Sequence, residues 1–211
     1  DPETIIKNYG ADTARLFMLS DSPPERDMEW TEAGVEGASR FLRRVHRLAQ
    51  DSNLSPVGTT VLPDSEGSAL ALIKTAHKSI ISLSTDIENF RFNRAVAQLH
   101  ILANAIAGVK PSDKGAAAAK RFGIETLAQL LSPLSPHIAE EIWKNLGHET
   151  MLATTAWPKA DESLAADDEV QVGIQVNGKL RDTITLSRDC ENAVAEARAL
   201  ESKIILRYLD G

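Results

Sequence analysis

A row of four arginines is the part of this 211-residue sequence whose spacing best fits a chemical task. At about 100° per residue they fall on one face of a predicted helix, with no acid between them. The residues of this row are Arg40, Arg43, Arg44 and Arg47. Guanidinium groups at such a spacing suit successive phosphates, because arginine can bind each one through two parallel hydrogen bonds. The alternative is an ordinary solvated helix face, so we treat the row as a candidate contact for RNA or another anion.

Two further cations, Lys179 and Arg181, lie at or beside a predicted hairpin tip and are the second choice for such contacts. Arg91 and Arg94 lie at a predicted helix junction. Taken singly, each of these residues fits a surface role better than a binding role.

The remaining reactive residues form no catalytic or metal-binding pattern. His137, Glu140 and Glu141 resemble part of a metalloprotease helix, but Glu141 occupies the position that needs a second histidine. We therefore expect a histidine at a helix start, followed by a solvated acidic face. Cys190 has no second cysteine to pair with, which favours a reducing compartment. The sequence predicts no catalytic residue and no metal site.

A series of helices must position these candidates. The segment 31–50 is predicted to be helical, and the face opposite the arginines carries the apolar residues Phe41, Leu42, Val45, Leu48 and Ala49. Two short helices are expected before residue 22, the second of them capped by Asp12. Further helices are predicted at 65–88, 93–107, 116–131 and 137–146. This pattern is typical of an antiparallel helical bundle, and the fold class is predicted to be mainly α.

The character of the sequence changes after Leu152. Residues 153–169 are rich in proline and acids, and an alternating apolar strand follows over 170–176. Asn177-Gly178 is a strong hairpin signal. A strict two-residue loop would place the two apolar sets of the hairpin on opposite faces, so we expect an odd-length loop or a bulge. A helical stretch over 189–209 completes a small α+β domain.

The net charge of −7 argues against nonspecific binding of nucleic acid, but its distribution changes that conclusion. Residues 1–30 carry −4 and residues 149–170 carry −5, which leaves +2 on the rest of the chain. A basic surface is therefore possible. No segment approaches the roughly 18 apolar residues of a membrane span, and we expect a cytoplasmic location.

Several motifs together resemble one known family, the bacterial-type leucyl-tRNA synthetases of class Ia. The segment GADTARLF at 10–17 is similar to a GADxxRLF element that follows the KMSKS loop of class I enzymes. Four other segments resemble elements of this family in the same order: 30–42, 92–97, 131–143 and 176–181. The last two read LSPLSPHIAEEIW and VNGKLR. The segment 131–143 alone would fit valyl or isoleucyl relatives equally well.

The resemblance implies a piece of a longer ATP- and Mg²⁺-dependent enzyme that joins leucine to tRNA(Leu). The HIGH and KMSKS motifs and any editing domain are absent from this sequence, so catalysis is expected from other parts of the enzyme, which is expected to be monomeric. The expected divisions are a stem-contact-like segment (1–30), an anticodon-binding-type bundle (31–152), a linker (153–169) and a truncated α+β domain (170–211). A protein-interaction bundle without an RNA role is the alternative from another functional class.

The resemblance also implies that another apolar strand follows a segment like 208–211 in the family. We therefore expect the last 40 to 50 residues to be less ordered than the bundle, because their sheet would have an unpaired edge.

Overall fold

The computed structural model describes residues 2–21, 27, 29–166, 169–188 and 190–209. The chain divides into two compact units, Asp1–Ala165 and Ala166–Gly211. Within the described residues, no helix is both long enough and apolar enough to cross a membrane.

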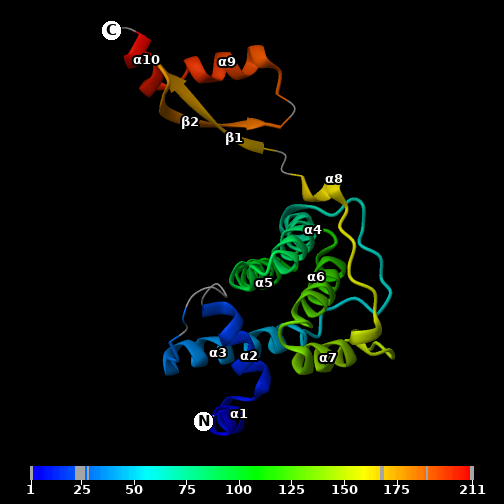
Figure 1. Ribbon diagram of the computed structural model, residues 1–211. Helices are drawn as coiled ribbons and strands as arrows, with labels where there is room; N and C mark the ends of the chain where they lie inside the picture. The colour runs from blue at the N-terminus through cyan, green and yellow to red at the C-terminus, as the bar shows by residue number, and fades with distance from the viewer. Residues whose placement is uncertain (1, 22–26, 28, 167–168, 189, 210–211) are drawn as a thin grey trace. The chain divides into compact units, whose positions relative to one another are not determined.

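The first unit is built from helices (Figure 1). In chain order they are α1 (Pro2–Tyr9), α2 (Ala11–Asp21), α3 (Glu32–Leu48), α4 (Gly67–Glu88), α5 (Phe92–Ala107), α6 (Ala116–Leu131), α7 (Pro136–Asn145), the 3-10 turn η1 (Leu152–Thr154) and α8 (Glu162–Ala165).

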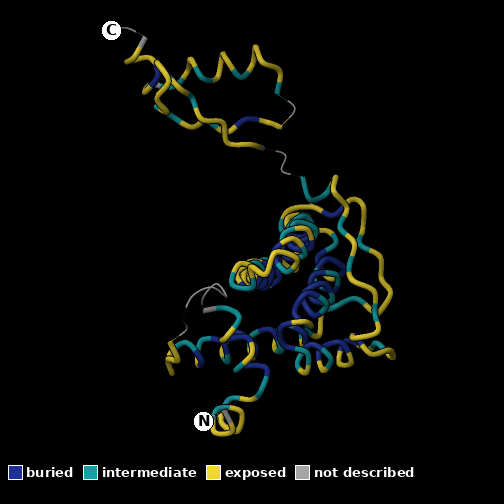
Figure 2. The backbone as a smooth tube through the Cα atoms, in the orientation of Figure 1, coloured by how far each residue is buried: buried dark blue, intermediate teal, exposed yellow. Residues whose placement is uncertain are grey.

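Helices α4, α5 and α6 pack against one another and form the centre of this unit. Their apolar faces meet in a continuous core, drawn as the dark blue stretches of Figure 2. Leu72, Leu99 and Leu127, one from each helix, are at most 1% exposed. Burial of a leucine side chain contributes about 1.5–3 kcal/mol, so these faces hold the three helices together. The predicted mainly α fold is confirmed.

Helix α3 packs its apolar face against the core, as its sequence predicted. Phe41, Leu42 and Val45 are buried. Thr31 caps the helix, because its hydroxyl accepts a hydrogen bond of 3.3 Å from the backbone N–H of Gly34. Gly34 also allows close packing: a Cβ at this position would come within 2.5 Å of the Phe17 ring on α2.

Two details of the predicted elements are wrong. Asp12 does not cap its own helix, because α2 begins at Ala11 and the carboxylate of Asp12 bonds residues of α7 instead. The expected continuous helix over 189–209 is two helices, α9 (Asn192–Leu200) and α10 (Lys203–Leu209). Ser202 causes the break, since its hydroxyl accepts from the backbone N–H groups of Ile204 and Ile205 and so starts a new helix.

The second unit contains an antiparallel hairpin of β1 (Glu169–Val176) and β2 (Lys179–Ser187), followed by α9 and α10. Val176 pairs with Lys179 across a two-residue turn, and the register shifts between Ile174 and Gln175. Arg181 is the residue left unpaired by this shift. The expected bulge is therefore confirmed.

The bulge decides which apolar residues share a face of the hairpin. Val172 pairs with Ile184 and Val170 with Leu186, so these four side chains lie on one face. Leu180 pairs with Gln175 and lies on the other face, where its side chain covers Gly173. The bulge thus aligns most of the two apolar sets and leaves Leu180 63% exposed.

Candidate nucleic-acid interface

Helix α2 is fastened to the connection between α6 and α7 by two polar side chains. Arg15 donates from Nε to the carbonyl of Leu134 at 3.3 Å and from Nη2 to the carbonyl of Pro133 at 3.1 Å. The proline-containing turn leaves these carbonyls without helical partners, so arginine supplies the missing donors. Two segments separated by more than 100 residues in sequence are thereby held together.

Asp12 completes the same junction. Its Oδ2 accepts a hydrogen bond of 2.7 Å from the backbone N–H of Ile138, and its Oδ1 lies 2.8 Å from Nδ1 of His137. Both partners belong to the first turn of α7, where backbone N–H groups lack acceptors and a negative charge is favoured. Asp12 therefore caps α7 from a distant part of the chain.

A groove of about 830 Å³ lies along this junction, lined by residues of α2, α3 and α7. Arg43 and Arg47, the two arginines of the row that line it, are exposed and stand one helical turn apart. His46 lies on the same wall, with its Nε2 3.5 Å from a carboxylate oxygen of Glu141 on α7. The groove thus presents two exposed guanidinium groups beside a single exposed acid on its opposite wall, an arrangement that can hold a phosphate.

The other two arginines of the row have different surroundings. Arg40 forms an ion pair with Glu36 at 3.3 Å, and both side chains are more than half exposed. Arg44 lies beside His100 of α5. Partial burial, and then the positive charge of Arg44, lower the pKa of that histidine. The predicted row is therefore divided: two members face the groove and two do not.

Lys179 and Arg181 lie in the second unit. Lys179 is exposed at the start of β2. Arg181 is half-buried, with its guanidinium carbon 4.5 Å from the centre of the Tyr208 ring and Nη1 donating to the Tyr208 hydroxyl at 3.2 Å. Arg181 thus joins the hairpin to α10, and Lys179 is the more accessible of the two.

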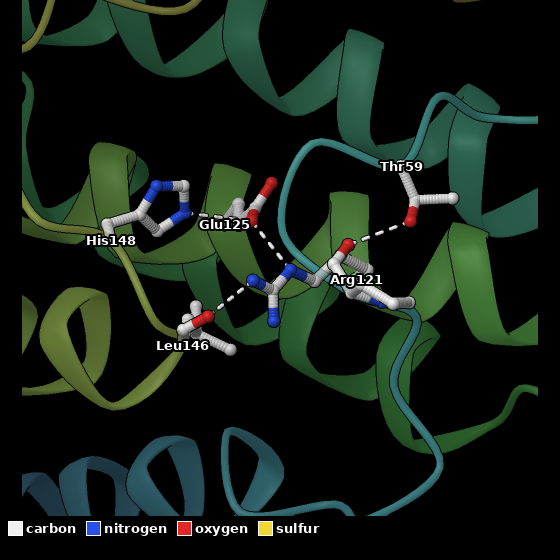
Figure 3. A network of polar contacts seen from close by, with 6 residues as sticks. Thr59, Arg121, Glu125, Leu146 and His148 are labelled. Atoms are coloured by element: carbon white, nitrogen blue, oxygen red, sulfur yellow. Dashed lines mark hydrogen bonds and ion pairs between the residues drawn. The ribbon is translucent and has the colours of Figure 1, made fainter.

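A largely buried polar network joins α6 to the end of α7 and the residues that follow it (Figure 3). Nε of Arg121 donates to Glu125 at 2.7 Å, and another nitrogen of Arg121 donates to the carbonyl of Leu146. His148 lies 2.8 Å from the same carboxylate and stacks on Trp143 at 3.6 Å. Because the Arg121 side chain is only 6% exposed, this network serves the fold and leaves no free cation for a ligand.

Of the two acids that the sequence placed on a solvated helix face, Glu141 is exposed as predicted, whereas Glu140 is engaged by backbone groups. Glu140 accepts hydrogen bonds of 2.8 Å from the backbone N–H groups of both Leu152 and Ala153, and so caps η1. His137 is engaged by Asp12, as described above. In the parts of the chain that the structure describes, no group of three or more histidine, cysteine or acidic side chains could hold a metal ion.

Sequence reasoning missed the residues that organise this region. The Arg121 and Glu125 pair carries a signal, since opposite charges four residues apart support a helix. Asp12 and Arg15 are fixed letters of the GADxxRLF element at 10–17, but the sequence does not reveal their partners, because each finds them through tertiary contact alone.

Comparison with known proteins supplies the family. The model of the anticodon-binding domain of tRNA ligase matches residues 70–196, which is more than half of the chain. The chain belongs to this anticodon-binding domain family.

Curated leucine–tRNA ligases match this chain along its whole length. It is 47% identical to the leucine–tRNA ligase of Rhodospirillum rubrum and 46% identical to that of Parvibaculum lavamentivorans. The alignments include 100% of this chain, but only 25% and 24% of those proteins. The chain thus spans about a quarter of the length of these curated relatives. The resemblance to leucyl-tRNA synthetases noted in the sequence is confirmed along the whole chain.

A solved structure has the same anticodon-binding fold. It is the crystal structure of a ternary complex of LeuRS, tRNA and LeuAMS from Agrobacterium radiobacter K84. The TM-score is 0.86 at 25% sequence identity, and the match covers 100% of this chain and 28% of that chain.

Proposed function

We propose that this chain binds tRNA(Leu) and positions it for ATP-dependent attachment of leucine by other domains of a longer leucine–tRNA ligase. The observation that carries the proposal is the match of the whole chain to a LeuRS chain whose structure includes tRNA. The membership of the anticodon-binding domain family supports the same conclusion.

Within this function, Arg43 and Arg47 are the proposed principal contacts of the first unit. Residues one turn apart on a helix have Cβ atoms about 5–6 Å apart, so the two guanidinium groups can bind neighbouring phosphates of one strand. Such contacts set the position of the RNA without reading its sequence. Arg40 and Arg44 are weaker candidates. Arg40 is already paired with Glu36, and Arg44 is only partly exposed beside His100.

Lys179 is the proposed principal contact of the second unit, and Arg181 contributes less because it is stacked on Tyr208. ATP and Mg²⁺ belong to the catalytic domains in this proposal. The described residues offer no cluster that fits a metal ion. We also propose that the enzyme is cytoplasmic and monomeric. Light scattering of the full-length protein would test the monomeric state.

The test uses the full-length ligase with the double substitution Arg43→Gln and Arg47→Gln. Loss of two phosphate contacts is expected to raise the KM for tRNA about tenfold, because each exposed ion pair contributes up to about 1 kcal/mol and a factor of ten corresponds to about 1.4 kcal/mol. Leucine-dependent exchange of pyrophosphate into ATP is expected to stay unchanged, since that reaction needs no tRNA.

The matched control is Lys110→Gln with Lys114→Gln, which removes the same charge from the connection between α5 and α6, outside the groove. Equal tRNA kinetics for the two double variants would refute the assignment of Arg43 and Arg47. Absence of tRNA binding by the unmodified enzyme at low salt would refute the function itself and favour a protein-interaction bundle. Exchange driven by valine or isoleucine would indicate a synthetase of different specificity.

A further inference from the structure

The turn between α4 and α5 carries an aromatic residue in a backbone conformation that normally requires glycine. Phe90 has φ +57°, in the left-handed region that residues with a Cβ disfavour. Helix α4 ends here in two hydrogen bonds, from the N–H of Phe90 to the carbonyl of Ile87 and from the N–H of Arg91 to that of Asp86. This pattern is a Schellman motif, in which glycine is the usual residue at the position of Phe90.

Packing does not explain the phenylalanine, because its side chain is 65% exposed. Its one aromatic neighbour in the described structure is Phe92, at 5.9 Å between ring centres and in an edge-to-face arrangement. Phe92 itself packs against the core and so gives the outer ring a fixed base. A strained and exposed aromatic side chain at a turn is a candidate for function, since the fold gains little from it.

Two arginines that follow Phe90 in the sequence share one buried acid. Nε of Arg91 lies 3.7 Å and Nε of Arg94 lies 3.5 Å from the same oxygen of Asp86, whose side chain is 5% exposed. The side chains of Arg91 and Arg94 are 44% and 62% exposed. The negative charges of Asp86 and Glu88 balance the positive charges of the two arginines, so the turn is not a basic patch. The ion pairs with Asp86 orient the two arginines instead.

We propose that Phe90 stacks on an unpaired base of the bound tRNA, with Arg91 and Arg94 contacting the adjoining phosphates. Proteins recognise unpaired RNA in this way, since every base has a face that can stack on an aromatic ring and arginine binds the backbone beside it. The inference rests on the proposed function, because it assigns one contact within the tRNA surface. The ligand is a single nucleotide whose base is turned out of its stack. Because every base has a face that can stack, the ring does not select one of the four bases.

The substitution Phe90→Gly in the full-length ligase separates the ring from the fold. Glycine suits the left-handed position, so the midpoint of thermal unfolding is expected to be no lower than that of the wild type. Binding of an unmodified tRNA(Leu) transcript is expected to weaken about tenfold, the usual effect of removing a stacked aromatic ring. Phe90→Trp is expected to keep the affinity, and Ile101→Ala, which removes an exposed apolar side chain from α5, is expected to have no effect.

Transcripts with one abasic unpaired position identify the stacked base. At that position the loss of the base and the loss of the ring are expected to be non-additive. Unchanged affinity of the Phe90→Gly variant would overturn the stacking proposal while leaving the function intact, because wild-type binding is measured in the same titration. Additive losses at every abasic position would overturn it as well, because the ring would then be independent of every base tested. No binding by the wild type would refute the function on which the inference rests.

Discussion

Asp12 is the residue on which the arrangement of the groove depends most directly. Its carboxylate is nearly buried and accepts from the first turn of α7, while Ser135 donates to its carbonyl at 3.3 Å. Together with Arg15, Asp12 therefore holds the start of α7 against α2. The adjacent α3 carries Arg43 and Arg47 on the third wall of the groove.

Replacement of Asp12 by alanine is expected to lower the free energy of unfolding by about 1–2 kcal/mol, because the N–H of Ile138 loses its acceptor and α7 loses its cap. Chemical denaturation measures the change. Asp12→Asn keeps an acceptor oxygen and is expected to recover part of the loss. An alanine variant as stable as the wild type would mean that solvent replaces the carboxylate at no cost.

At this scale, sequence reasoning predicted side chains whose role depends on their own helix. The arginine row was found because helical spacing alone places its members on one face. The division of the row was not predicted. Arg40 forms an ion pair with Glu36, and Arg44 lies beside His100 only in the folded bundle. The strain at Phe90 left no trace in the sequence, since the residue type does not reveal the positive φ that its backbone adopts.

The extended segment between η1 and α8 crosses α4 and α6 and is tied down by side chains. Trp157 donates from Nε1 to the hydroxyl of Ser84 at 2.8 Å, and the backbone N–H of Asp161 donates to Nδ1 of His77 at 3.1 Å. The second bond requires an unprotonated Nδ1. Burial lowers the pKa of His77 from its ordinary value of 6.5, against the opposing effect of Asp161, and so favours the form that accepts this bond.

Acidification is therefore expected to destabilise the attachment of this segment. Because the pKa of His77 is lower in the folded state, its contribution is complete above pH 6.5 and is lost as the pH falls through the lowered value. Other histidines also titrate in this range, so the difference in stability between the wild type and His77→Gln isolates the effect. Glutamine keeps an acceptor that does not titrate, and a constant difference across the pH range would contradict the prediction.

Elements with a strong period were predicted well, and their ends were not. The four long helices from α4 to α7 begin and end within two residues of the predicted limits, because apolar spacing and proline or glycine mark them. The bulge followed from counting apolar residues on each side of the Asn177-Gly178 turn. The end of α9 did not follow from the sequence. Ser202 caps the next helix only because the folded chain brings its hydroxyl to the N–H groups of Ile204 and Ile205.

The whole molecule combines a well-filled helical unit with a second unit that has a small core. In the described part of the second unit, Leu186 and Ile205 are the buried apolar side chains, while Leu180, Val194 and Leu200 are more than half exposed. A two-stranded hairpin with so few buried contacts is marginally stable in water.

Amide hydrogens of β1 and β2 are therefore expected to exchange faster than those of α4, α5 and α6. Hydrogen exchange followed by mass spectrometry measures both units in one sample. Equal protection of the hairpin and the central helices would show that the second unit is as stable as the first. Addition of tRNA(Leu) is expected to protect the hairpin further if Lys179 contacts it, and Lys179→Gln is the control for that contact.

The bulge in the hairpin has a consequence for how its length can vary. Arg181 lies between Leu180 and Asp182 and has no cross-strand partner. Removing it would leave an unbroken ladder in which every other pair is unchanged. Val172 would still face Ile184, and the apolar face would be preserved. A relative one residue shorter at this position would keep the same hairpin and lose only the bridge to Tyr208. The bulge therefore marks a position where a single-residue deletion changes a contact without reversing the sheet.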